Sequence, residues 1–323
     1  MPERAAAPLA SFDFLEGVPE DELDVLAGTM RRRELRAGQV LWRQGDESHE
    51  LAFVLAGHIA ISLQLPGGAA VEVSSVGPGE VMGEMGVIDG GPRPVTATAA
   101  EPTTVLLLGR ADFSALVSRR HPTAFALKRR VARMGCAALR GQYTSLADSL
   151  GGGAPPDVAA DAELEFRGPP DSRYVRRLAT FHAFDSLALW GFLTAGRYAQ
   201  CPPNRTLVAE GTASPACYLT INGAVEKVIV RGGRRIRVGL AGPGLAFGYE
   251  SLIDGGPSPV TAITRERTLV LELPTAAFER LFNGDQSKSH VFLDVIHRNL
   301  TASLRQALRP QARLAVSLAP PAS

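Results

Sequence analysis

This chain has few cysteines, few tryptophans and almost no net charge. Its 323 residues include three cysteines and two tryptophans, and 34 basic residues stand against 33 acidic ones. Cys136, Cys201 and Cys217 lack Cys-x-x-Cys spacing, which argues against a disulfide framework or a structural zinc site. A net charge of +1 provides no broad basic surface. We therefore expect no nucleic-acid partner, and we expect Trp42 and Trp190 to fill core or domain contacts.

Long hydrophobic runs and catalytic motifs are also missing. No apolar run approaches the roughly 20 residues that span a bilayer, and the N-terminus has no signal-peptide pattern. We expect a cytoplasmic protein without a membrane partner. No serine, cysteine or lysine stands in a nucleophile motif, which predicts a protein that is not an enzyme. His290 and His297 have no nearby acid, so we expect no metal site.

One segment of the chain occurs twice. Residues 83–97 read Gly-Glu-Met-Gly-Val-Ile-Asp-Gly-Gly-Pro-Arg-Pro-Val-Thr-Ala, and residues 248–262 read Gly-Tyr-Glu-Ser-Leu-Ile-Asp-Gly-Gly-Pro-Ser-Pro-Val-Thr-Ala. The offset between the copies is constant through the segment, which indicates two copies of one domain. A chain of this length is also long enough for two domains, each with its own core.

Each copy is predicted to be mainly β. Short apolar runs alternate with turns such as Gly45-Asp46 and Gly77-Pro78-Gly79, a pattern typical of an antiparallel double-sheet roll or barrel. We expect two antiparallel β-roll or jelly-roll domains, each flanked by α-helices. The predicted boundaries are 10–150 for the first domain, 151–170 for a glycine- and proline-rich linker, 171–312 for the second domain and 313–323 for a disordered tail.

Helical periodicity returns at the end of each copy. In the second copy, apolar residues recur at every fourth position and outlast the length needed to close one roll. Such a stripe would leave apolar surface exposed in a monomer, which predicts a homodimer through the terminal helices. The alternative is that the stripe folds back on its own roll. Its members are Phe292, Ile296, Leu300, Leu304 and Leu308.

The repeated segment carries charges in the first copy that the second copy has lost. Glu84 becomes Tyr249, and Arg93 becomes Ser258. A glycine-rich turn that opens a short helix suits an anion, and Arg93 can add a bidentate fork to it. Glu84 would repel a phosphate but can accept from a sugar hydroxyl, so a ribose phosphate satisfies both residues.

The segment resembles the phosphate-binding cassette of the cyclic nucleotide-binding domain family. That family includes the regulatory subunits of cyclic AMP-dependent kinase and the bacterial catabolite activator protein. Its pattern is Phe-Gly-Glu-Leu-Ala-Leu followed by Pro-Arg-Ala-Ala-Thr, and this chain has Met-Gly-Glu-Met-Gly-Val at 82–87 and Pro-Arg-Pro-Val-Thr at 92–96. The resemblance extends over nearly the whole of both repeats.

The resemblance implies a cyclic nucleotide, cyclic AMP or cyclic GMP, in the first domain and none in the second. By that likeness Glu84 would accept from the ribose 2′-hydroxyl and Arg93 would hold the cyclic phosphate. The remaining ligand-lining positions would be Gly83, Met85, Gly86 and Val95. Ligand binding would move residues within 122–150 and signal to an effector protein that the sequence does not identify.

Two departures from the family pattern leave an alternative open. Pro94 follows Arg93 and has no backbone N–H to donate, and Gly86 replaces the usual alanine. The alternative is a structural or interaction protein built from two rolls that no longer bind nucleotide. The residues after Leu273 supply one helical region and a tail, too little for a helix-turn-helix in addition.

Overall fold

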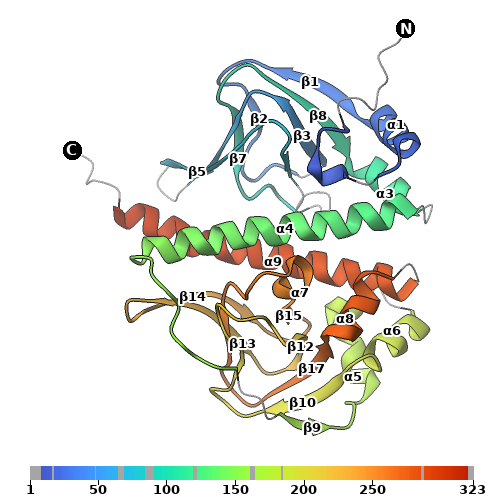
Figure 1. The fold of residues 1–323 in the computed structure, drawn as a ribbon, viewed down its shortest axis with the longest axis vertical. Coiled ribbons are helices and arrows are strands. Elements are labelled where there is room, and N and C mark those ends of the chain that lie inside the picture. The colour runs from blue at the N-terminus through green and yellow to red at the C-terminus, as the bar shows by residue number, and fades with distance from the viewer. Residues whose placement is uncertain are drawn as a thin grey trace. The chain divides into compact units, whose positions relative to one another are not determined.

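The computed structural model describes residues 9–16, 18–47, 49–64, 69–83, 91–118, 122–160, 164–182, 185–284 and 287–318. The chain divides into two compact units, Met1–Met134 and Gly135–Ser323. Figure 1 labels their helices and strands.

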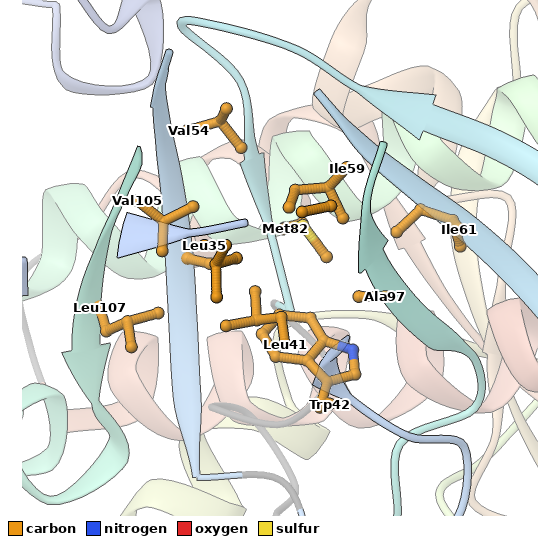
Figure 2. Close-up of a cluster of buried hydrophobic side chains, with 12 residues drawn as sticks. Leu35, Leu41, Trp42, Val54, Ile59, Ile61, Met82, Ala97, Val105 and Leu107 are labelled. Carbon is orange, nitrogen blue, oxygen red and sulfur yellow. The ribbon is translucent and has the colours of Figure 1, made fainter. Parts of the chain in front are cut away.

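The first unit is built from two four-stranded antiparallel sheets. Their strand orders are β1-β8-β3-β6 and β2-β7-β4-β5. Side chains from both sheets meet in one buried cluster that includes Trp42, Val54, Ile61 and Val105 (Figure 2), so the sheets pack face to face. The strands are β1 (Arg31–Leu35), β2 (Val40–Trp42), β3 (Glu50–Ala56), β4 (Ile59–Gln64), β5 (Ala70–Val76), β6 (Val81–Met82), β7 (Thr96–Ala99) and β8 (Thr103–Gly109).

Alternation along β4 shows why these residues form a roll. Ile59, Ile61 and Leu63 are buried while the residues between them are partly exposed, as expected for a strand with one face on a core. The turn before β4 requires Gly57, because its φ is +79° and a Cβ there would lie 2.5 Å from the Pro102 carbonyl oxygen.

Helices flank the first roll at both ends. The 3-10 helix η1 (Asp13–Leu15) and α1 (Glu20–Thr29) precede the roll, and α3 (Arg110–Ser118) and the start of α4 (Pro122–Ser149) follow it. The first turn of α1 contains Glu20, Asp21 and Glu22, and their negative charges stabilise the positive N-terminal end of the helix dipole. Leu23 and Leu26 of α1 pack with Phe53 in a second buried cluster.

The second unit repeats the plan. Its two antiparallel sheets have the orders β15-β12-β17-β10-β9 and β11-β16-β13-β14. The strands are β9 (Glu165–Arg167), β10 (Arg197–Cys201), β11 (Thr206–Val208), β12 (Ala216–Asn222), β13 (Val225–Arg231), β14 (Arg234–Ala241), β15 (Ala246–Phe247), β16 (Thr261–Thr264) and β17 (Thr268–Pro274). The predicted fold class, two antiparallel β-rolls with flanking helices, is confirmed.

The helices of the second unit cover its roll. Besides the end of α4, they are α5 (Ser172–Arg176), the 3-10 helix η2 (Ala179–Phe181), α6 (Ser186–Leu193), α7 (Glu250–Asp254), α8 (Thr275–Phe282) and α9 (Ser287–Leu318). Phe192 of α6 and Phe278 of α8 both contact Phe292 of α9, with ring centroids 5.8 and 5.4 Å apart. These aromatic contacts tie the three helices together.

Several details differ from the sequence-based expectations. The boundary along the chain between the compact units falls between Met134 and Gly135, within α4. The sequence predicted that the first domain ends at residue 150. Residues 165–167, within the predicted linker, form β9 because they pair with β10 along the edge of a sheet. The predicted tail begins at residue 313, but α9 runs to Leu318. Trp42 is buried as expected, whereas Trp190 is 60% exposed.

The apolar stripe of α9 is covered within the chain. Phe292, Ile296, Leu300, Leu304 and Leu308 are each at most 8% exposed. Phe292, at the start of the stripe, contacts Phe192 and Phe278 of its own unit, as the alternative left open by the sequence expects. The exposed surface from which a homodimer was predicted is therefore not present at these five residues, and the homodimer itself stays a prediction.

Candidate functional site

The candidate site of the first roll begins where β6 ends, at Gly83. Its φ is +90°, a conformation that favours glycine. A Cβ at this position would lie 2.8 Å from Arg93 Nη1, 2.9 Å from the Glu50 carbonyl oxygen and 3.1 Å from Trp42 Cη2. Glycine therefore allows the backbone to pass directly beside the Arg93 side chain.

Arg93 is buried, with 5% of its surface exposed. Its guanidinium carbon lies 3.7 Å from the centre of the Trp42 ring, a cation–π contact. Its Nη2 donates to the Glu50 carbonyl oxygen at 2.8 Å. A buried guanidinium can hold an anionic group through charge-assisted hydrogen bonds.

Two backbone hydrogen bonds hold Arg93 against the turn that follows β2. The Gly45 N–H donates to the Arg93 carbonyl oxygen at 2.9 Å, and the Arg93 N–H donates to the Asp46 carbonyl oxygen at 2.7 Å. We name this pair of bonds the backbone clip. The Gln44 N–H also donates to Thr96 Oγ1 at 3.0 Å. Main-chain bonds thus hold residue 93 in place in addition to the bond from its side chain to the Glu50 carbonyl.

The structure brings together three of the predicted site residues. Gly83 and Arg93 are in direct proximity, and the partly buried Val95 packs against the cluster that contains Trp42. Glu84, Met85 and Gly86 lie outside the described residues. Their predicted roles stay predictions.

The equivalent position of the second roll has the same backbone and a different side chain. Gly211 N–H donates to the Ser258 carbonyl oxygen at 2.9 Å, and Ser258 N–H donates to the Thr212 carbonyl oxygen at 2.7 Å, which repeats the backbone clip. Gly248 again has a positive φ, and its nearest side-chain neighbour is Ser214 Oγ. Ser258 Oγ donates to the Val260 carbonyl oxygen at 2.8 Å. The second roll therefore keeps the geometry and offers no cation at this position.

Buried polar residues of the second unit link residues 248–262, its copy of the repeated segment, to α9. We call this copy the second cassette. Tyr249 is fully buried, and its hydroxyl lies 3.2 Å from Ser303 Oγ, which accepts from Lys227 Nζ at 2.7 Å. Burial raises the pKa of the neighbouring Glu250, and Lys227 opposes that shift. Burial likewise lowers the pKa of Lys227. Tyr249, whose counterpart in the first roll is Glu84, is thus committed to an internal contact.

The second roll contains a buried ion pair and is hydrogen-bonded to α9. Arg231 and Glu210 form a buried ion pair with Nη2 and Oε1 2.6 Å apart. Asn299, Ser303 and Gln306 lie at i, i+4 and i+7 on α9, and all three hydrogen-bond to the roll. Asn299 accepts from the Ala246 N–H at 2.6 Å and Gln306 accepts from the Leu240 N–H at 3.2 Å, while Ser303 accepts from Lys227.

The end of α4 is fastened to the second cassette by Arg140. Its Nε and Nη2 donate to the Asp254 carboxylate at 2.9 to 3.0 Å, and its Nη1 donates to the Pro257 carbonyl oxygen at 2.6 Å. Cys136 and Tyr143, on the same helix, are each 1% exposed. The end of α4 is therefore an integral part of the second unit.

We expect Arg140→Ala to loosen this end of α4. The ion pair is partly exposed, so its loss should cost about 1 kcal/mol, or roughly a fivefold increase in the opened population. The buried Cys136 thiol reports opening, because iodoacetamide reacts with it only when it is uncovered; peptide mass spectrometry gives its labelling rate. Arg298→Ala, at an exposed arginine of α9, is the matched control. Equal labelling of the two variants would contradict this prediction.

Sequence reasoning missed the contacts made by Trp42 and by the polar face of α9. Trp42 was expected to fill core or domain contacts, and its ring also stacks against the Arg93 guanidinium. The polar residues Asn299, Ser303 and Gln306 follow the same helical period that revealed the apolar stripe. That helical period could have predicted that a polar face of α9 also contacts the roll.

The fold agrees with a family comparison. The model of the family described as "Cyclic nucleotide-binding domain" matches residues 32–120 and 199–285, more than half of the chain. The chain belongs to the cyclic nucleotide-binding domain family. The matched stretches include most strands of both rolls, while β9 lies outside them. Among the helices that the structure describes, none combines the length and apolarity needed to cross a membrane.

Individual relatives match only parts of the chain or at low identity. The "Cyclic AMP receptor protein" of Thermus thermophilus is 33% identical over 122 residues, which are 36% of this chain and 56% of that protein. The "Acetyltransferase Pat" of Mycolicibacterium smegmatis is 34% identical over 31% of this chain and 30% of its own length. The regulatory domain of Toxoplasma gondii PKA, solved with cAMP, is 21% identical over 90% of this chain and 94% of that chain, with a TM-score of 0.34. The chain thus spans about half or less of these curated relatives.

Proposed function

We propose that the first roll binds one cyclic nucleotide, cyclic AMP or cyclic GMP, and that the protein is a cytoplasmic sensor without catalytic activity of its own. The observation that carries this proposal is Arg93, a buried guanidinium beside Gly83 in a family that binds cyclic nucleotides. A cyclic phosphate supplies the single negative charge that such a buried cation favours. The name of the Thermus relative supports cyclic AMP as the first ligand to test.

In this proposal the second roll does not bind a cyclic nucleotide. Ser258 offers a neutral hydroxyl where Arg93 stands in the first copy, and that hydroxyl already bonds to the Val260 carbonyl. Tyr249 is held by Ser303, and Arg231 is paired with Glu210. A nucleotide would have to displace these internal partners without gaining a cation for its phosphate, so we assign the second roll to assembly rather than sensing.

The route of the signal runs through α4. Ligand binding in this proposal shifts the equilibrium between two positions of α4, and the end of that helix carries Arg140, which is fastened to Asp254 and Pro257. A change in α4 would therefore reach the second cassette through that ion pair. The effector would be a protein that reads this change, and neither nucleic acid nor membrane is part of the proposal.

A second candidate function is a structural protein that binds no nucleotide. Its supporting observation is that Arg93 already has partners, since it stacks on Trp42 and donates to the Glu50 carbonyl. Pro94, which lacks an N–H, also reduces the donors beside it. The two candidates differ in one measurable quantity, the heat of cyclic nucleotide binding.

We expect calorimetry to show one cyclic nucleotide bound per chain, because the first roll has Arg93 where the second roll has Ser258. The buried cations of the second roll, Arg231 and Lys227, already bond to protein. Cyclic AMP and cyclic GMP are titrated separately into the full chain, with 5′-AMP and 5′-GMP as the respective acyclic controls. Each control carries the same base and sugar as its cyclic ligand, so tighter binding of the cyclic ligand shows recognition of the cyclic phosphate. Two equivalent sites would contradict the assignment of the second roll, and no heat with either cyclic ligand would favour the structural protein.

A further inference from the structure

We propose that the indole N–H of Trp42 is a ligand donor, which hydrogen-bonds the anionic group that Arg93 holds. This proposal rests on the proposed function of the first roll. Trp42 is the last residue of β2 and is only 8% exposed. Its Nε1 is buried and has no hydrogen-bond partner among the residues that the structure describes. A buried N–H without a partner costs free energy unless something else accepts from it.

The surroundings of the indole explain why protein does not satisfy it. Trp42 lies in a cluster of apolar side chains from both sheets, and its nitrogen is the only one drawn in Figure 2. In that view it lies on the side of the ring toward Ala97, the residue that pairs with Trp42 across β2 and β7. Ala97 has only a methyl group to offer. Among the described side chains of this cluster, none carries an oxygen acceptor for the indole N–H.

The position of Arg93 indicates what that acceptor is. The guanidinium carbon lies 3.7 Å from the centre of the Trp42 ring, so an oxygen atom held by the guanidinium lies beside the same ring. The ring and the cation both present donors, and a single anion can accept from both. A phosphate oxygen has lone pairs for two such bonds.

The turn after Arg93 leaves room for this additional donor. Pro94 contributes no backbone N–H at the position next to the guanidinium. An indole N–H on the neighbouring strand would restore the number of donors around the anion. The second roll fits this interpretation, because Val208 stands at the position of Trp42 and Ser258 at that of Arg93, so both donors are absent together.

The test uses the protein with Trp190→Phe, in which Trp42 is the single tryptophan. Trp190 is 60% exposed in the second unit, so its replacement should leave the first roll unchanged. With ¹⁵N-labelled tryptophan, the spectrum contains one indole N–H signal. We expect cyclic AMP or cyclic GMP to shift its proton resonance downfield, as formation of a hydrogen bond to an anionic oxygen requires. A role in packing alone would not produce that shift.

The affinity test uses Trp42→Phe, which removes the N–H and keeps an aromatic ring under Arg93. We expect a loss of affinity for the cyclic nucleotide of roughly tenfold or more, the effect of a hydrogen bond to a charged group. Unchanged affinity in Trp42→Phe, or an indole resonance that does not move in saturated protein, would overturn the proposal and leave the proposed function intact. If the unaltered chain binds neither cyclic nucleotide, both are overturned.

Discussion

Arg93→Ala should nearly abolish cyclic nucleotide binding while the first roll stays folded. Truncating the cationic partner of a buried anion costs about 2–5 kcal/mol, a loss of roughly 30- to 4,000-fold in affinity. The fold should survive, because the backbone clip bonds residue 93 through its N–H and carbonyl and not through its side chain. Calorimetry gives the affinity and a thermal melt gives the stability.

Arg93→Lys is the matched control for charge. Lysine keeps the positive charge but loses the planar fork and the stacking on Trp42, so we expect an affinity between those of Arg93→Ala and the unaltered chain. An affinity of Arg93→Ala equal to that of the parent would show that Arg93 does not hold the ligand. A variant that fails to fold would contradict the role given to the backbone clip.

Arg231→Met should strongly destabilise the second unit. The Arg231 and Glu210 side chains are 10% and 7% exposed, so removal of the arginine leaves a buried carboxylate without its cation. Such a loss costs about 3–5 kcal/mol. Cys201 and Cys217 are buried in the same roll, and their rate of labelling by iodoacetamide reports its opening. We expect that rate to rise by roughly 100-fold or more.

The double variant Glu210→Leu, Arg231→Met separates the ion pair from simple packing. With both charges removed, no buried group is left unpaired, and the stability should return to within about 1 kcal/mol of the parent. If the double variant were as unstable as Arg231→Met, the loss would come from packing. If Arg231→Met were labelled at the parental rate, the pair would contribute nothing measurable.

The fold could be predicted from local sequence patterns because the same patterns occur in both halves of the chain. The duplicated segment, the alternating strands and the closing helices indicate two rolls from the sequence alone. Arg93 and Gly83 could be identified from their spacing, and the structure brings them into contact. These signals depend on residues close together in the sequence, where periodicity and turn chemistry are informative.

Contacts between distant residues could not be predicted in this way. Ser303 meets Tyr249 and Lys227 only because α9 crosses the roll, and the ion pair of Arg231 with Glu210 joins β13 to the turn after β11. The fate of the apolar stripe on α9 also depended on tertiary packing. Its period was correct, but period alone does not say whether a face meets its own roll or a second copy.

The backbone clip also bears on how two copies of one domain diverge. At this position two supporting hydrogen bonds involve only main-chain atoms and do not require a particular side chain, whereas the arginine side chain proposed to bind the ligand also donates to the Glu50 carbonyl. A mutation from arginine to serine after duplication would remove one capacity and leave the other nearly untouched. The retention of the same paired bonds around Ser258 fits such a history. In this architecture the side chain at the position of Arg93 can be exchanged while the main-chain hydrogen bonds of the backbone clip are kept. One copy of the domain can therefore lose its proposed ligand-binding residue and keep its fold.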